Sequence, residues 1–191
     1  MAGEHGQVRD TELNAEQEAR RRLALAQIRQ YPDPVLRMQA REVEEFEGGI
    51  GQLVERMRHL LADANGVGLA ATQIGVVRRV FVFQREGEEE PTALVNPRLV
   101  AHSEELVSDE EGCLSLQTVR VPVERHPTVT LEARTPDGGD LKLELEGLDA
   151  RVAQHELDHL DGVLIIDRTT PEARREALGA LRPQPVLGVR I

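Results

Sequence analysis

Apolar residues recur with a helical period in two stretches of the chain. Between residues 50 and 61 they return every three or four positions with charged residues between them, which predicts an amphipathic helix that stops at the Asn-Gly pair 65–66. Between Leu148 and Leu164 the apolar residues do not keep to one stripe, so a helix there is apolar nearly all round. Such a helix belongs in the interior of a protein.

The ends of this interior helix and two further helices are also indicated. Asp149 suits the cap at its start, and Gly162 suits the position just past its end. We expect another helix to begin near Thr11 or Asn14, and a C-terminal helix to run from Pro171 to about residue 181.

Strand patterns fill the middle of the chain. Residues 129–145 alternate between apolar and polar on either side of a Pro-Asp-Gly-Gly turn at 136–139, which predicts a β-hairpin. Residues 79–84 are typical of a buried strand, and two apolar pairs are expected to flank a turn at Asn96-Pro97. Because short strands run together and helices lie at both ends, the fold class is α+β with mostly antiparallel sheet.

Composition narrows the class of protein. A chain of 191 residues suits one domain, and 40% hydrophobic residues with 2% aromatics predict an aliphatic core. A net charge of -11 opposes a dedicated nucleic-acid surface or binding to an anionic membrane. The single cysteine, Cys113, excludes an intramolecular disulfide and fits a reducing compartment. With no membrane span or targeting segment in the sequence, we expect a soluble, cytoplasmic protein.

The interior helix carries the motif His-Glu-x-x-His at residues 155–159. His155 and His159 are four residues apart and therefore share one helix face, where two neutral imidazoles can hold one metal ion. Glu156 lies about 100° round the helix axis, so it can reach a water on the metal without being a ligand. This arrangement is typical of metal-assisted hydrolysis.

A metal site of this kind needs a third protein ligand. The residues alone leave two kinds of candidate: Cys113, which follows Gly112, and a downstream carboxylate such as Glu172 or Glu176. The longer metzincin pattern fails, because Ile165 stands where it requires a third histidine.

A stretch of small residues, Gly-Val-Gly-Leu-Ala-Ala-Thr-Gln-Ile-Gly, occupies positions 66–75. A helix is expected before it and a strand after it, which is the reverse of a dinucleotide-binding fingerprint. We interpret it as a loop in which Gly66 and Gly68 allow a ligand backbone to approach closely. Gln73 can offer a side-chain N–H to a developing oxyanion.

The stretch at 66–75, Glu-Gly-Cys-Leu-Ser at 111–115 and the motif around 155–159 together closely resemble the three signature motifs of peptide deformylase. The resemblance runs from about residue 27 to about residue 170. It implies that residues 26–182 form the catalytic domain, with sheets packed around a central metal-binding helix. Residues 1–25 would be a charged, loosely held and partly helical extension, and residues 183–191 a C-terminal tail.

The resemblance also assigns roles to residues. Cys113, His155 and His159 would be the metal ligands, and Glu156 the general acid/base. Gln73 and the backbone N–H of Leu114 would form the oxyanion hole. Five residues would line the cleft in which a peptide is held like an added strand: Gly66, Val67, Gly68, Leu69 and Gly112.

The implied activity is removal of the N-terminal formyl group from formyl-methionine of newly made polypeptides, with release of formate. Fe(II) is the metal such enzymes typically use, although zinc, nickel or cobalt can occupy the site. The partner would be the formyl-methionyl N-terminus of a nascent peptide, and association with the ribosome is compatible with that substrate. The chain departs from the family at Gln117, where proline is usual, so the loop after the second motif is expected to take a different path.

Two other functions remain as alternatives. The first is a zinc metalloprotease with Glu172 or Glu176 as third ligand and Cys113 merely buried. The second is a metal-binding or ribosome-associated module that keeps the site for structure, but the presence of Glu156 argues for catalysis.

Overall fold

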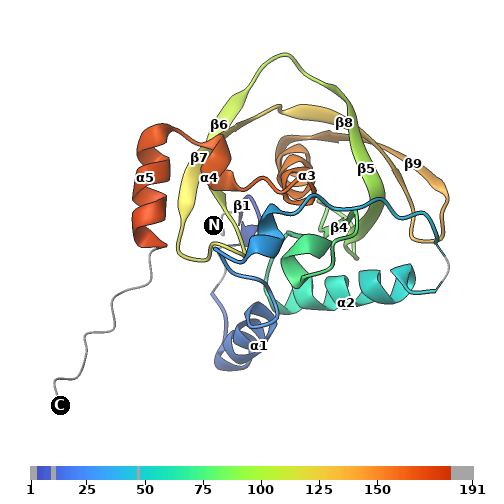
Figure 1. Cartoon of the computed structure of the whole chain (residues 1–191), viewed down its shortest axis with the longest axis horizontal. Helices are drawn as coiled ribbons and strands as arrows, with labels where there is room; N and C mark the ends of the chain where they lie inside the picture. Colours follow the sequence, from blue (N-terminus) through green and yellow to red (C-terminus); the bar gives the residue numbers. More distant parts are fainter. Residues whose placement is uncertain (1–3, 10–11, 47, 182–191) are drawn as a thin grey trace.

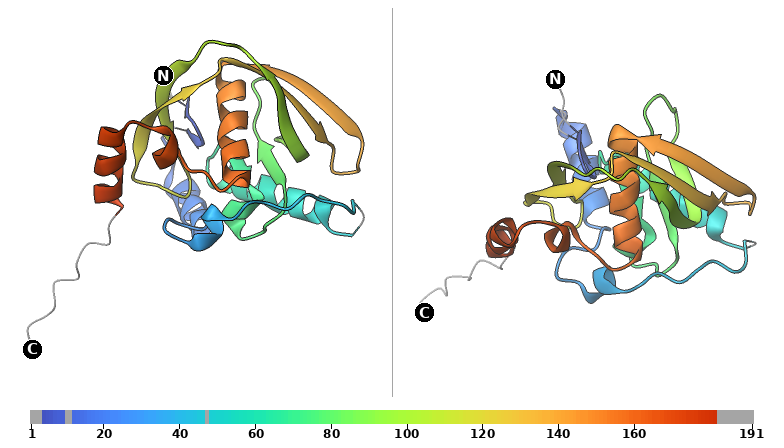
Figure 2. Two further views of the ribbon diagram at one scale, coloured as in Figure 1. Left: turned by 45° about the horizontal axis from the view of Figure 1, so that its top comes forward. Right: turned by 90° about the horizontal axis from the view of Figure 1, so that it is seen from above.

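The computed structural model describes residues 4–9, 12–46 and 48–181. One long helix, α3, runs through the middle of the molecule, with a large sheet on one side and a two-stranded sheet on the other (Figures 1 and 2). The predicted α+β class with antiparallel sheets around a central helix is confirmed. The expected tail at 183–191 lies outside the described residues.

The described helices are α1 (Ala15–Leu25), α2 (Ile50–Asp63), α3 (Gly147–Leu160), α4 (Ile165–Arg168) and α5 (Pro171–Ala180), with short 3-10 helices η1 (Pro34–Arg37) and η2 (Ala71–Ile74). The described strands are β1 (Glu4–His5), β2 (Val8–Arg9), β3 (Gly68–Ala70), β4 (Val80–Phe83), β5 (Thr92–His102), β6 (Val107–Gly112), β7 (Arg120–Arg125), β8 (Thr128–Arg134) and β9 (Asp140–Glu146).

The large sheet has the order β3-β4-β5-β8-β9 with every neighbouring pair antiparallel. The predicted hairpin is present as β8 and β9. The turn expected at Asn96-Pro97 is wrong, because β5 continues through it with register shifts. Asn96 takes a left-handed φ of 51°, and its side-chain amide pairs with both the N–H and the carbonyl of Val43, so the irregularity is absorbed as a bulge.

Helices cover both faces of this sheet. Side chains alternate across a strand, and in β4 the valines Val80 and Val82 pack into the cluster formed by α1 and α2, whereas Phe81 and Phe83 pack against α3. The amphipathic α2 ends close to the predicted position and contributes side chains to the cluster that contains Val80 and Val82. As predicted, α3 is buried nearly all round.

The second sheet is the antiparallel pair β6 and β7, which the sequence patterns did not indicate. Its core cluster includes Cys113, Val121 and Val123 from this region and is completed by residues of α4 and α5. The chain passes from the large sheet to this one between β5 and β6 and returns to the large sheet between β7 and β8.

Where the structure describes it, the N-terminal extension contains helix α1 and contacts the rest of the domain. Asn14 and Gln17 form a reciprocal capping box that starts α1, close to the predicted helix start. Ala24 and Leu25 at the end of α1 are buried in the core cluster with α2. Further upstream, Gln7 has no exposed surface.

The start of α3 differs from the prediction, and its end does not. Glu146 occupies the N-cap position and Asp149 lies in the first turn, where a carboxylate still favours the helix dipole. Gly162 follows the C-cap in a left-handed conformation with φ 73°, as a C′ residue does.

Across the described ranges, we find no helix with the length and apolar character needed to cross a bilayer.

Gly162→Ala should destabilise the fold, because a side chain at φ 73° is strained and its Cβ would lie 2.6 Å from the Arg37 carbonyl oxygen. We expect a loss of at least about 1–2 kcal/mol in urea unfolding. Gly179→Ala, at an exposed position of α5 with open space around it, is the matched control and should gain about 0.5–1 kcal/mol. Equal effects at the two positions would contradict the strain at Gly162.

Candidate metal centre and active site

The two histidines and the glutamate that define the predicted motif lie on α3 and are almost completely buried. His155, Glu156 and His159 are 2%, 0% and 1% exposed. The imidazole rings lie one helical turn apart with their centroids separated by 5.0 Å. Burial lowers the pKa of His159 well below its ordinary value, helped by the nearby charges of His155 and Arg125, and this favours the neutral ring that ligates metals.

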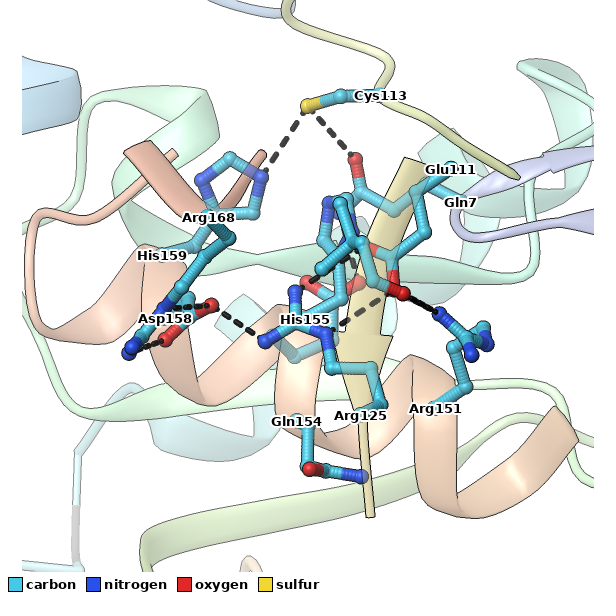
Figure 3. Close-up of polar contacts among 12 residues, drawn as sticks. Gln7, Glu111, Cys113, Arg125, Arg151, Gln154, His155, Asp158, His159 and Arg168 are labelled. Carbon is cyan, nitrogen blue, oxygen red and sulfur yellow. Dashed lines mark hydrogen bonds and ion pairs between the residues drawn. The ribbon is translucent and has the colours of Figure 1, made fainter. Parts of the chain in front are cut away.

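Cys113 reaches the two histidines from the second sheet. It is the residue directly after β6, and its Sγ lies 3.2 Å from Nε2 of His159 (Figure 3). One ligand atom each from Cys113, His155 and His159 fall within 4.8 Å of one another. Two elements that are far apart in sequence therefore bring one sulfur and two nitrogen donors together.

The donor set fits a divalent transition metal. Tetrahedral bonds of about 2.3 Å to sulfur and 2.1 Å to nitrogen place ligand atoms about 3.4–3.6 Å apart, which this group can meet. Nε2 of His155 is buried without a hydrogen-bond partner, as an atom reserved for a metal would be. Burial raises the pKa of the Cys113 thiol, so the sulfur requires a bound cation to become a thiolate.

The orientation of His155 is fixed by Glu111, a residue that the sequence did not single out. Glu111 accepts a hydrogen bond from Nδ1 of His155 at 2.9 Å, which leaves Nε2 as the free acceptor. Arg125 donates two bonds of 3.0 Å to Glu111, and Arg151 adds one of 2.8 Å (Figure 3). Burial would raise the pKa of Glu111, but His155 and then Arg125 outweigh it and hold the pKa well below its usual range.

A second buried carboxylate, Asp158 of α3, extends this network. Arg125 donates to it at 2.6 Å, and Arg168 of α4 donates to both of its oxygens. Arg125 therefore links β7 to β6 through Glu111 and to α3 through Asp158.

Glu156 lies beside Gly68, the first residue of β3. A Cβ placed on Gly68 would lie 2.2 Å from Oε1 of Glu156, so only glycine leaves room for this carboxylate. Oε2 of Glu156 is buried without a partner. Burial raises the pKa of Glu156 well above its ordinary value, which suits a group that takes up and releases protons.

The small-residue stretch is not the loop that we expected. It forms β3 and the 3-10 helix η2, and Gln73 on η2 is completely buried. The Gln73 amide donates from Nε2 to Oγ of Ser115 at 3.1 Å, and its Oε1 accepts from the backbone N–H of Ala70 at 2.9 Å. The amide is thus fixed beside the Cys113 segment.

The other residues predicted to line the cleft surround the same point. Val67 precedes β3 and Leu69 lies within it, and both are buried. Gly112 is the last residue of β6, and Gly66 packs against the side chain of Leu114. The structure thus brings the three motifs together around one small volume.

Gln7 is a second residue of this region that the sequence did not reveal. Its side chain contacts Gln73, Glu156, Cys113 and the backbone N–H of Leu114. No motif or periodicity marked it, since it lies in the polar segment before the predicted domain. Glu111 was at least recognisable as the residue two positions before Cys113.

The carboxylates of the alternative ligand set lie elsewhere. Glu172 and Glu176 are exposed on α5, which packs on α4 and β7, and Glu172 pairs with Arg175. Within residues 4–9, 12–46 and 48–181, the metal-competent group contains neither of them. Gln117 is exposed and lies near α1.

Comparison with known proteins agrees with this geometry. Residues 25–175 match the family Polypeptide deformylase. Peptide deformylase 1 of Corynebacterium glutamicum is 40% identical over 162 residues, covering 84% of this chain and 96% of the relative. A peptide deformylase from Thermodesulfovibrio yellowstonii is 38% identical over 155 residues, covering 80% of this chain and 93% of the relative.

Solved structures give the same result. A crystal structure of a peptide deformylase from Legionella pneumophila matches with a TM-score of 0.75 and 36% identity, over 82% of this chain and 98% of that one. The peptide deformylase from Thermotoga maritima matches with a TM-score of 0.72 and 42% identity, over 75% and 97%. With sequence, fold and site in agreement over most of its length, the chain belongs to the polypeptide deformylase family.

Proposed function

We propose that this protein is a metal-dependent hydrolase that removes the formyl group from the N-terminal formyl-methionine of newly made polypeptides and releases formate. The observation that carries the proposal is the convergence of Cys113, His155 and His159 in a chain of this family. The substrate places the enzyme in the cytoplasm, where it would meet nascent chains at or near the ribosome.

Cys113, His155 and His159 hold the metal in this proposal, with Fe(II) as the resident ion and zinc, nickel or cobalt as substitutes. When bound, the ion supplies Lewis acidity and lowers the pKa of a coordinated water. By accepting from Nδ1, Glu111 leaves Nε2 of His155 free, and this atom would be the one that holds the ion.

Glu156 moves the protons. Its buried carboxylate takes a proton from the attacking water and passes it to the departing amine. Gln73 and the N–H of Leu114 stabilise the charge that develops on the formyl oxygen, because both donors are fixed by burial before the reaction begins. The peptide lies along Val67, Gly68 and Gly112 as an added strand.

The metalloprotease alternative has little support. Its carboxylate ligands would have to come from α5, where Glu172 and Glu176 face solvent. The family match also favours formyl hydrolysis over peptide-bond hydrolysis.

The ligand set separates the two functions. Anaerobically purified protein should release formate from a formyl-methionyl peptide, and Cys113→Ala should lose both bound metal and this activity. The only thiol of the holo-protein should resist alkylation until a chelator removes the ion. The double variant Glu172→Ala/Glu176→Ala is the control and should keep both properties. The reverse pattern would replace the deformylase proposal with the protease.

Glu156→Ala should leave metal content near normal while formate release falls by about 10²–10⁴-fold, because the residue lies off the ligand face of α3. Metal analysis and steady-state kinetics measure the two quantities on one preparation. Parallel loss of metal and activity would instead make Glu156 a ligand.

Gln73→Ala should lower turnover far more than substrate affinity, with a cost of about 3–4 kcal/mol in the transition state. Gln52→Ala, an exposed glutamine on α2, is the matched control and should behave as wild type. A change confined to KM would show that Gln73 only positions the substrate.

A further inference from the structure

Residues 4–9, ahead of the matched domain in sequence, place Gln7 in the proposed substrate cleft. Strands β1 and β2 pair as a short antiparallel hairpin, and Gly6 and Gln7 form its tip. Gly6 forms a parallel bridge with Gly112 and has a φ of 61°. A Cβ on Gly6 would lie 2.8 Å from the Gly112 carbonyl oxygen, so the close approach depends on glycine.

The backbone of Gln7 is held on both sides by the cleft. Its N–H donates to the Gly112 carbonyl at 3.2 Å, and its carbonyl accepts from the Val67 N–H at 3.1 Å. These are two of the residues along which the proposed function lays the peptide substrate. An added strand would need the same backbone groups.

The side chain of Gln7 fills the position proposed for the formyl group. Its Oε1 accepts from the Leu114 N–H at 3.1 Å and from Nε2 of Gln73 at 3.0 Å, the two proposed oxyanion donors. The Gln7 Nε2 donates to Oε1 of Glu156 at 2.7 Å. The Gln7 Oε1 lies 3.3 Å from Sγ of Cys113 (Figure 3).

The chemistry of the two groups is equivalent. In a formamide and in a carboxamide alike, the carbonyl carbon bears one oxygen and one nitrogen, and that nitrogen carries hydrogen. In Gln7 the oxygen faces the donors and the N–H faces the general acid/base, as the reacting formamide must. The Gln7 carbon differs in bearing a methylene where the formyl carbon bears hydrogen.

We propose that residues 4–9 are an internal pseudosubstrate, which occupies the cleft of the resting enzyme through Gln7 and must leave before a formyl peptide binds. The inference rests on the proposed function. The helix after this segment, α1, is anchored in the core by Ala24 and Leu25. The departed segment therefore stays tethered to the domain and competes at a fixed effective concentration. The family match begins at residue 25, so this device lies outside the matched part.

An intramolecular competitor lowers apparent substrate affinity by the fraction of molecules with an open cleft. Gln7→Ala should therefore lower KM for a formyl-methionyl peptide by about five- to thirty-fold with kcat unchanged. Gln7→Glu should act in the same direction, since it sets a carboxylate against Glu156. Gln52→Ala is the matched control and should leave KM and kcat unchanged.

A second measurement needs no substrate. Hydrogen exchange of residues 4–9, followed by mass spectrometry in metal-loaded and metal-free protein, reports the same opening equilibrium. The factor by which Gln7→Ala accelerates exchange should equal the factor by which it lowers KM. Thermal unfolding of each variant should show that the rest of the fold is intact.

Each other outcome overturns the inference. Faster exchange with unchanged KM would show that peptide enters beside the segment, and a fall in kcat would make Gln7 a participant in catalysis. Unchanged exchange in both variants would show that Gln7 does not hold the segment. No formate release from any protein, wild type included, would count against the proposed function and would remove the basis of the inference with it.

Discussion

The buried carboxylate of Glu111 is the constraint on which the site depends. Three elements meet at it: β6 supplies Glu111, β7 supplies Arg125, and α3 supplies Arg151 and His155. An ionised carboxylate without exposed surface is costly unless it is paired and hydrogen-bonded, and here both oxygens have cationic partners. Loss of one partner would leave an uncompensated charge, so the network fixes the two-stranded sheet of β6 and β7 against the central helix.

Local patterns in the sequence predicted the parts of the site that are local. His155 and His159 could be placed on one face because helix geometry fixes the i, i+4 relation. The residues alone leave the third ligand open between Cys113 and two carboxylates, and only the family resemblance selects Cys113. Cys113 and His159 are 46 positions apart. Hydrophobic periodicity is a local property, so it cannot predict which distant strand ends beside the helix. Glu111 and Arg125 were missed for the same reason.

The misplaced elements failed through tertiary contacts. Asn96 followed by proline is typical of a turn, but hydrogen bonds between its side chain and the Val43 backbone let the strand continue through it. Gln73 was expected in a loop because its neighbours are small. Those small residues instead permit a strand and a tight helical turn under α3. The polar extension was expected to be loose, and Gln7 has partners that only the folded site provides.

The double-sided burial of β4 bears on how this enzyme can be engineered. A strand with one solvated face tolerates polar substitutions there, but Val80–Phe83 has none, because valines fill one layer and phenylalanines the other. A slip of one residue would exchange large and small side chains between the two layers at once. Redesign of the large sheet therefore has freedom at its edge strand β9, where every second residue is exposed, while β4 can be varied only by coordinated repacking of both cores.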